Sequence, residues 1–271
     1  KNHFDLVILN GDRYEIFGAA IASYFFNIKI AHFHGGELTQ GLIDEGIRHS
    51  ITKMSHYHFV STEKYKKRVA QLGENIKNIY FVGALSLDNI LKYKYLKKNE
   101  LEKILNYKFK KYNFLFTYHP LTLESNNSKQ QITTILKALN EFKDCGVIFT
   151  KSNSDTDSKV ISNEINKYVK KNKDRCVLFD SLGSFLYFST LKQVQCVIGN
   201  SSSGIIEVPS FKIPTVNIGS RQTGREKAES IIDIKCNFID IVNAIKKSQK
   251  KNFNSKLKNY TNPYYKKKYS L

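Results

Sequence analysis

The sequence lacks tryptophan, has four prolines and one methionine, and contains no long hydrophobic run. Its longest apolar stretch, residues 17–26, is too short for a helix that crosses a bilayer, so we expect no membrane partner. The four cysteines lie at least 20 residues apart and form no CxxC pair. That spacing fits neither a zinc knuckle nor a secreted disulfide framework, and we expect a protein of the reducing cytoplasm.

Arginine is also scarce, because only six of the 43 Lys and Arg residues are Arg in a chain of formal charge +19. Such a charge alone suggests a nucleic acid or an anionic membrane surface as partner. Arg, however, is the side chain best suited to recognise phosphates and bases. The abundance of Lys, Asn, Ile, Tyr and Phe is typical of an AT-rich coding sequence. We expect no nucleic-acid partner, and a basic nucleic-acid- or anion-binding module stays an alternative.

Short apolar runs alternate with longer amphipathic stretches along the 271 residues. The expected strands are 5–9, 29–33, 58–61, 79–82, 114–118, 147–150, 176–179, 195–198 and 215–218. The expected helices include 15–26, 44–57, 62–72, 129–142, 160–171 and 238–248. Strands separated by helices of this length indicate βαβ units, and runs that are apolar on both faces indicate parallel sheets covered on both sides.

A Lys-, Tyr- and Asn-rich stretch, residues 92–111, interrupts this pattern. We read it as a linker followed by the first helix of a second domain, which gives an N-terminal α/β domain over 1–91 and a C-terminal one over 92–250. Residues 251–271 are read as a Lys-rich tail, with the start of a final helix as the alternative. The aromatic row 24–26 is expected to be core. Two such domains in series place the default ligand site in the cleft between them.

Ionisable side chains follow two strands of the first domain. Asp12 and Arg13 come after the run LVILN, and His34 and Glu37 come after KIAHF, while Asp44 opens the next helix. Carboxylates and an imidazole at one sheet edge are the groups that acid–base chemistry requires. Helix capping is the alternative for the two aspartates, and it is more plausible for Asp44, which has Arg48 four residues on, than for Asp12.

Two His-x-His pairs, 32/34 and 56/58, could each hold a metal from one face of a strand. Further ligands at suitable spacing are missing, and we expect no metal.

The second domain contains GNSSSG at 199–204, directly after the run QCVI. Small residues at a strand-to-helix turn let backbone N–H groups and the hydroxyls of Ser201 and Ser202 face an anion. The sequence is neither a Walker loop nor GxGxxG. Glu207, one or two turns into the following helix, is placed to accept hydrogen bonds from ribose hydroxyls.

Three of the six arginines, Arg13, Arg221 and Arg225, follow strand ends, and His119 follows the strand-like run FLFTY. In a chain that otherwise uses Lys, this placement favours bidentate contact with a diphosphate over an ordinary surface role.

Taken together, these residues resemble the hydrolysing UDP-N-acetylglucosamine 2-epimerases of bacterial sialic and legionaminic acid synthesis. The resemblance runs in order along nearly the whole chain. It is carried by GDRYE (11–15), HFHGGELTQGLIDEGIRHSITKMSHYHFVST (32–62), YHP (118–120), NSDTDS (153–158), VIGNSSSGIIEVP (197–209) and NIGSRQTGR (217–225). It implies a GT-B-like α/β fold with two Rossmann-like domains and an interdomain cleft.

The resemblance also implies roles for these residues. Those that match acid–base positions are Asp12, Glu37 and Asp44, with His34 where many relatives carry Glu. Those that match nucleotide or sugar contacts are Arg13, His119, Asn153, Ser201, Ser202, Glu207, Arg221 and Arg225. The implied reaction eliminates the nucleoside diphosphate to leave a 2-acetamidoglucal, and water then adds with inversion at C2. No cofactor is implied, and we expect a homo-oligomer (dimer or tetramer).

The chain departs from the family in beginning without one or two βα units and in lacking much of the terminal helix. We therefore expect a fragment of a longer enzyme, with weak or no activity by itself. A non-hydrolysing 2-epimerase is the alternative enzyme, although GDRYE and HGGE differ from the patterns of that branch. A GT-B glycosyltransferase is a third reading. The amino sugar and the base, uracil or guanine, stay open.

Overall fold

The computed structural model describes residues 4–39, 43–120, 127–152 and 157–266. The chain divides into two compact units, each built on a parallel β-sheet. The first unit comprises Lys1–Asn89, Thr223–Glu226 and Pro263–Leu271, and the second comprises Ile90–Gln222 and Lys227–Asn262. Two short segments that follow second-unit elements along the chain therefore belong to the first unit.

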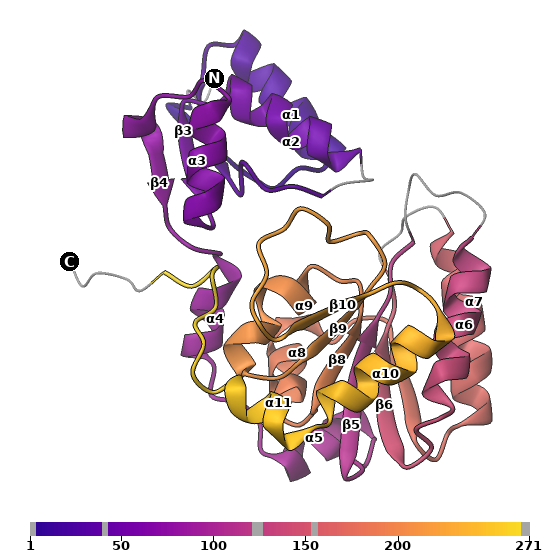
Figure 1. Cartoon of the computed structure of the whole chain (residues 1–271). Helices are drawn as coiled ribbons and strands as arrows, with labels where there is room; N and C mark the ends of the chain where they lie inside the picture. Colours follow the sequence, from indigo (N-terminus) through magenta and orange to yellow (C-terminus); the bar gives the residue numbers. More distant parts are fainter. Residues whose placement is uncertain (1–3, 40–42, 121–126, 153–156, 267–271) are drawn as a thin grey trace. The chain divides into compact units, whose positions relative to one another are not determined.

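The first unit contains a four-stranded parallel sheet in the order β1-β2-β3-β4 (Figure 1). Its strands are β1 (Leu6–Asn10), β2 (Lys29–Phe33), β3 (Tyr57–Val60) and β4 (Ile79–Phe81). The connecting helices are α1 (Tyr14–Phe25), α2 (Asp44–Met54) and α3 (Glu63–Gln71). Leu9, Ala20, Ile30 and Ile51 join β1, β2, α1 and α2 in one buried cluster, which fixes the strand ends that carry the polar residues.

The second unit contains a six-stranded parallel sheet in the order β10-β9-β8-β5-β6-β7 (Figure 1). Its strands are β5 (Tyr112–Thr117), β6 (Cys145–Thr150), β7 (Cys176–Phe179), β8 (Cys196–Gly199), β9 (Thr215–Ile218) and β10 (Ile231–Ile234). Both faces of this sheet are covered. Phe114 and Phe116 face a core completed by α6 (Ser128–Leu139), α7 (Ser158–Lys171) and α10 (Phe238–Ser248). Leu115 faces the opposite core, with α5 (Lys98–Leu105) and α8 (Gly183–Leu191).

The smaller elements are α4 (Ser86–Lys92), α9 (Ser203–Ile206), α11 (Lys251–Lys256) and the 3₁₀ turns Ile76–Asn78 and Val208–Phe211. None of the helices in the described ranges combines the length and apolar character that a bilayer crossing demands.

The expected strands and helices are present, and the largest differences lie at helix ends. The helix expected over 44–57 stops at Met54, because the residues after it pair in β3. The sequence analysis did not identify β10, α4 or α8. The short helix expected after GNSSSG corresponds to α9, and α11 corresponds to the alternative of a final helix in the C-terminal stretch. The α/β class with two parallel sheets is confirmed.

The C-terminal stretch expected as a Lys-rich tail contains ordered, partly buried structure. Lys251–Lys256 form α11 in the second unit, while Tyr264 lies fully buried in the first. The apolar residues between the lysines explain the difference, since Leu257 is buried as well. Long Lys stems can line such a surface while their ammonium groups stay in water.

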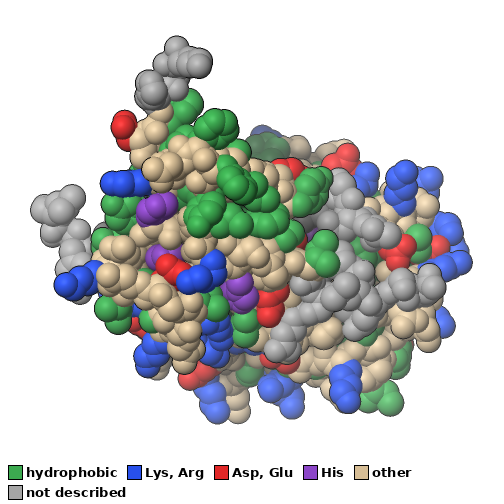
Figure 2. Space-filling view, turned by 90° about the horizontal axis from the view of Figure 1, so that it is seen from above, with side chains coloured by type: hydrophobic (Ala, Val, Ile, Leu, Met, Phe, Trp, Pro, Cys, Tyr) green, Lys and Arg blue, Asp and Glu red, His purple; other side chains and the backbone are tan. Residues whose placement is uncertain are grey.

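The aromatic row expected to be core is exposed. Tyr24, Phe25 and Phe26 at the end of α1 are 56%, 82% and 79% exposed, and Ile8 on β1 is 65% exposed. Hydrophobic side chains gather on the first unit in Figure 2. The expectation was wrong because a row of apolar residues does not by itself identify the part of the chain that would cover it. Contiguous exposed apolar side chains are uncommon on isolated soluble domains.

Replacing both Phe25 and Phe26 by Ser should lower binding of a hydrophobic dye such as ANS without lowering the free energy of unfolding. Both rings are largely exposed, so their loss opens no cavity. The control is Phe114→Ser, a fully buried ring whose loss should destabilise the second unit by at least about 3 kcal/mol. Unchanged dye fluorescence in the double variant would contradict the assignment of this surface.

Candidate functional site

The first-unit site lies at the carboxyl ends of two neighbouring strands. Asn10 is paired with Phe33 at the end of the β1–β2 register, so Asp12 and His34 follow adjacent strands. The Gly11 N–H donates to the Phe33 carbonyl at 3.3 Å, and the His34 N–H donates to the Phe59 carbonyl at 3.0 Å. The structure therefore brings the two predicted segments to one sheet edge.

Asp12 forms an ion pair with Arg48 of α2. Arg48 is 1% exposed, and it also donates to the Glu37 carbonyl at 2.7 Å and to the Thr39 hydroxyl at 3.1 Å. One guanidinium thus fixes both the Asp12 turn and the 37–39 loop. The capping alternative is not what the structure shows for Asp12, because α1 has Arg13 as its N-cap residue without a side-chain hydrogen bond.

Glu37 is the centre of a second ionic cluster, and its carboxylate is 4% exposed. His34 Nδ1 lies 2.9 Å from Glu37 Oε1, and the Ser61 hydroxyl donates to the same oxygen at 2.7 Å. Arg225 NH1 lies 2.8 Å from Glu37 Oε2. Burial alone would raise the pKa of Glu37, but Arg225, His34 and Arg48 together hold it well below its ordinary value. These neighbours therefore favour the carboxylate form of Glu37.

Arg225 reaches this cluster from the segment Thr223–Glu226, and its side chain is 9% exposed. The Glu226 N–H donates to the Tyr65 hydroxyl at 2.9 Å, and the Tyr264 hydroxyl donates to the Glu226 carbonyl at 3.0 Å. The two tyrosine hydroxyls lie 2.9 Å apart. The sequence analysis grouped Arg225 with Arg221, whereas the structure assigns the two to different units.

The other predicted residues of the first unit are less enclosed. Arg13 is exposed, 3.2 Å from Glu15, and its guanidinium lies over the Tyr14 ring. Asp44 is the first residue of α2 and half-buried, and the N-cap residue of that helix is Ile43. Asp44 therefore does not occupy the capping position that was its alternative.

The histidines of the His-x-His pairs have structural contacts. His32 is fully buried, with Nε2 at 2.9 Å from the Gly11 carbonyl oxygen. Burial, with the nearby charges of His58 and Arg48, lowers the pKa of His32 to about 4, so its ring is neutral at pH 7. Within the described ranges, no group of three or more His, Cys, Asp and Glu residues is placed to hold a metal ion.

The second-unit site lies at the carboxyl ends of β5, β8 and β9. Asn200 is its central residue, because its side chain accepts from the His119 N–H at 2.7 Å and donates to the His119 carbonyl at 2.8 Å. Gln222 Nε2 in turn donates to the Asn200 carbonyl at 2.8 Å. Three strand-end loops are thereby tied together. The sequence analysis missed both amides, although Asn200 lies inside the serine-rich motif.

Gly199 makes this close approach possible. Its φ is +137°, and a Cβ at this position would lie 1.8 Å from the Thr117 carbonyl oxygen. Only glycine fits where the backbones of β5 and β8 meet in this way.

Ser201 and Ser202 follow this turn and precede α9, which has only four residues. The Ser202 side chain makes no capping hydrogen bond, and the Ser203 hydroxyl donates to the Tyr187 hydroxyl at 2.7 Å. Glu207 Oε2 and Gln222 Oε1 are buried, and neither has a hydrogen-bond partner in the described part of the chain. A buried acceptor without a partner is costly, so these two atoms are suited to accept from a ligand.

His119 is neutral in this site. Burial, followed by the positive charge of Arg221, lowers its pKa to about 3. Its imidazole can therefore offer an anionic ligand a hydrogen bond but no charge, which Arg221 supplies. Asn153, the remaining predicted contact, lies outside the described residues.

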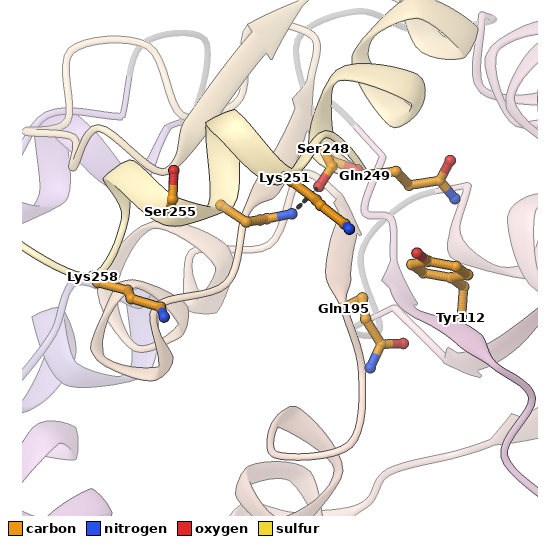
Figure 3. Close-up of a pocket in the computed structure, with 8 residues that line it drawn as sticks. Tyr112, Gln195, Ser248, Gln249, Lys251, Ser255 and Lys258 are labelled. Carbon is orange, nitrogen blue, oxygen red and sulfur yellow. Dashed lines mark hydrogen bonds between the residues drawn. The ribbon is translucent and has the colours of Figure 1, made fainter.

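A cavity of about 290 Å³ lies elsewhere in the second unit. Tyr112, at the start of β5, and Gln195, just before β8, line it together with Lys251 and Lys258 (Figure 3). It is therefore at the amino ends of these strands, away from the loops of Asn200 and His119.

Comparisons with known proteins agree on one family. The family model described as UDP-N-acetylglucosamine 2-epimerase matches residues 1–270. The chain is 46% identical over 249 residues to the GDP/UDP-N,N'-diacetylbacillosamine 2-epimerase (hydrolyzing) of Campylobacter jejuni, covering 92% of this chain and 64% of that protein. It is 43% identical over 267 residues to the polysialic acid biosynthesis protein P7 of Escherichia coli, covering 98% and 68%.

The fold is also found in solved structures. The S. aureus MnaA–UDP co-structure has a TM-score of 0.78 at 18% identity, covering 96% of this chain and 70% of that one. The Neisseria meningitidis UDP-GlcNAc 2-epimerase bound to UDP-GlcNAc has a TM-score of 0.78 at 17% identity, covering 96% and 72%. The GT-B-like fold class is thus confirmed, and the chain spans somewhat less than two thirds of the Campylobacter relative. By family match and by sequence identity, the chain belongs to the UDP-N-acetylglucosamine 2-epimerase family.

Proposed function

We propose that this protein is a hydrolysing 2-epimerase, which converts a nucleoside diphosphate 2-acetamido sugar into a free mannosamine-type sugar and the nucleoside diphosphate. Two side-chain contacts at the ends of adjacent strands carry the proposal. One is the ion pair of Asp12 with Arg48, and the other is the contact of His34 with Glu37. The 46% identity to a relative named as hydrolysing supports it.

Asp12 is suited to begin the reaction. Its carboxylate is ion-paired with Arg48, and the side chain remains 25% exposed, so a reactant can reach it. In the elimination, a base takes the proton from C2 of the sugar, the C1–O bond to the diphosphate breaks, and a C1=C2 double bond forms. Water then adds its oxygen to C1 while C2 receives a proton on the other face. No electron is gained or lost overall.

The second-unit site supplies what the leaving group requires. Arg221 offers charge to the diphosphate, while Ser201, Ser202 and neutral His119 offer hydrogen bonds. The buried Glu207 oxygen accepts from ribose hydroxyls. We assign Arg225 to the Glu37 cluster instead of the diphosphate. Arg13 and Asp44 stay candidates for sugar or nucleotide contact and for acid–base work. The nucleotide base stays open between uracil and guanine, since the names of the relatives include UDP and GDP forms.

The four cysteines support action in a reducing compartment, because all are free and three are buried.

Incubation with UDP-N-acetylglucosamine or its 2,4-diacetamido analogue should yield nucleoside diphosphate and free mannosamine-type sugar. Proton NMR of the products checks this, and in deuterated water the C2 position should carry deuterium. An equilibrium of two intact nucleotide sugars would instead indicate the non-hydrolysing alternative. Binding of RNA in preference to UDP at physiological salt would indicate the basic binding module.

Asp12→Asn should lower the rate of nucleoside diphosphate release by about 100-fold or more, because the amide cannot accept the C2 proton. UDP affinity, measured by calorimetry, should remain within about twofold, since the proposed diphosphate and ribose contacts of the second unit are unaltered. Glu63→Gln, an exposed carboxylate at the start of α3, is the matched control and should leave both unchanged. Normal turnover in Asp12→Asn would remove Asp12 from the reaction.

Glu207→Gln should weaken UDP binding by about tenfold, equivalent to about 1.4 kcal/mol, through loss of a charged acceptor. The loss should shrink with 2'-deoxy-UDP, which lacks one of the hydroxyls that Glu207 is proposed to bind. The exposed Glu229→Gln is the control for charge alone. An equal loss for both nucleotides would place Glu207 away from the ribose.

A further inference from the structure

We propose that His34 Nε2 delivers the proton to C2 in the hydration step, and that Glu37, Ser61 and Arg225 are positioning residues for the His34 ring. This inference rests on the proposed hydrolysing epimerase activity and assigns separate roles to residues that the sequence groups together.

The contacts of Glu37 decide which ring nitrogen can react. Glu37 is a carboxylate, which can only accept, so the His34 nitrogen 2.9 Å away must carry the proton. That nitrogen is Nδ1, and Nε2 is therefore the ring position that exchanges a proton with a reactant. The His34 side chain is 22% exposed, which gives a reactant access. A carboxylate at Nδ1 also stabilises the positive charge that appears when Nε2 is protonated.

Glu37 itself is not suited to carry a proton. Its side chain is 4% exposed, and both of its oxygens are engaged, Oε1 by His34 and Ser61 and Oε2 by Arg225. Its cationic neighbours, Arg225 first, hold its pKa well below the ordinary value. We assign Glu37 a positioning role, because its fixed carboxylate sets the orientation and tautomer of the His34 imidazole.

The backbone around His34 is also specialised. His34 has a φ of +66°, a left-handed conformation that costs non-glycine residues energy and often accompanies functional sites. Gly36, two residues later, has a φ of +77°. A Cβ at this position would lie 2.7 Å from the Tyr65 carbonyl oxygen and 2.8 Å from Val69 Cγ2, so no larger residue fits. The loop is therefore held in one path against α3, and Arg68 donates to the Gly36 carbonyl at 2.6 Å.

Asp12 and His34 face opposite electrostatic partners, which separates their roles. Asp12 is ion-paired with Arg48 and partly exposed, and it serves as the acceptor of the C2 proton. His34 contacts the Glu37 carboxylate through Nδ1, which leaves Nε2 as the ring nitrogen that donates a proton to C2. In hydration, the Nε2–H bond breaks as the C2–H bond forms, and the water oxygen bonds to C1 and releases a proton to solvent. One proton acceptor and one proton donor suit a reaction that removes a proton from a carbon and returns a proton to the same carbon.

His34→Asn separates the two steps experimentally. Asn tolerates the left-handed conformation and keeps an N–H donor for Glu37, but it has no proton carrier equivalent to Nε2. We expect UDP release to continue while the unsaturated 2-acetamidoglucal accumulates, with formation of the free sugar at least about 100-fold slower. A product ratio like that of the unaltered protein would overturn the proposal, and so would loss of UDP release.

A double-mutant cycle tests the positioning role. Glu37→Gln should also cause the glycal to accumulate, Ser61→Ala should do so more weakly, and Glu37→Gln should add nothing in a His34→Asn background. The matched control is Glu74→Gln, which alters another carboxylate–imidazole contact of the same unit, Glu74 with His58 at 3.2 Å. It should change thermal stability without changing the product ratio. Additive effects of the His34 and Glu37 substitutions would overturn the positioning role.

Nitrogen-15 NMR of the histidine rings gives a readout that does not depend on turnover. The His34 ring should carry its proton on Nδ1 when neutral, and Ser61→Ala should reduce this preference. A neutral His34 ring protonated at Nε2 would overturn the dyad even in an active enzyme. If no nucleotide sugar is hydrolysed by the unaltered protein, the proposed function fails, and the NMR result still shows whether the dyad exists.

Discussion

The neutralisation of a buried carboxylate, Glu37, is the constraint on which much of the first unit depends. A buried charge without a partner costs several kcal/mol, so a cation must be supplied from somewhere in the chain. Arg225 supplies it, and Thr223–Glu226 therefore belongs to the first unit although it follows β9 of the second. The hydroxyls of Tyr65 and Tyr264 hold that segment by hydrogen bonds to Glu226.

The parallel sheets could be predicted from the sequence because their strands are short, apolar on both faces and separated by helices of regular length. The same reasoning placed Asp12 and His34 at one sheet edge, since the carboxyl ends of parallel strands lie together. It failed for Phe25 and Phe26, because a hydrophobic sequence pattern does not identify which part of the structure packs against those side chains. It failed again at Tyr264, where single apolar residues are buried among lysines.

The partners of long side chains were beyond sequence reasoning. Arg48 lies four residues after Asp44 and invites a local pairing, yet it is paired with Asp12. Arg225 resembles Arg221 in its place after a strand, yet it is paired with Glu37. A guanidinium spans several ångströms, so the carboxylate that it meets depends on tertiary structure and not on closeness in the sequence. Asn200 and Gln222 gave no signal because an amide that ties loops together looks like any polar loop residue.

The discontinuous make-up of the first unit has a consequence for the order of folding. A chain emerging from the ribosome contains β1 to β4, with Glu37 already among them, well before Arg225 is synthesised. Until the second sheet has been built as far as β9, that carboxylate has no guanidinium to meet, and enclosing it is unfavourable. The first unit should therefore complete its core last although it is translated first. A shortened chain that ends at the close of β4 would be expected to remain loosely ordered around the HGGE loop.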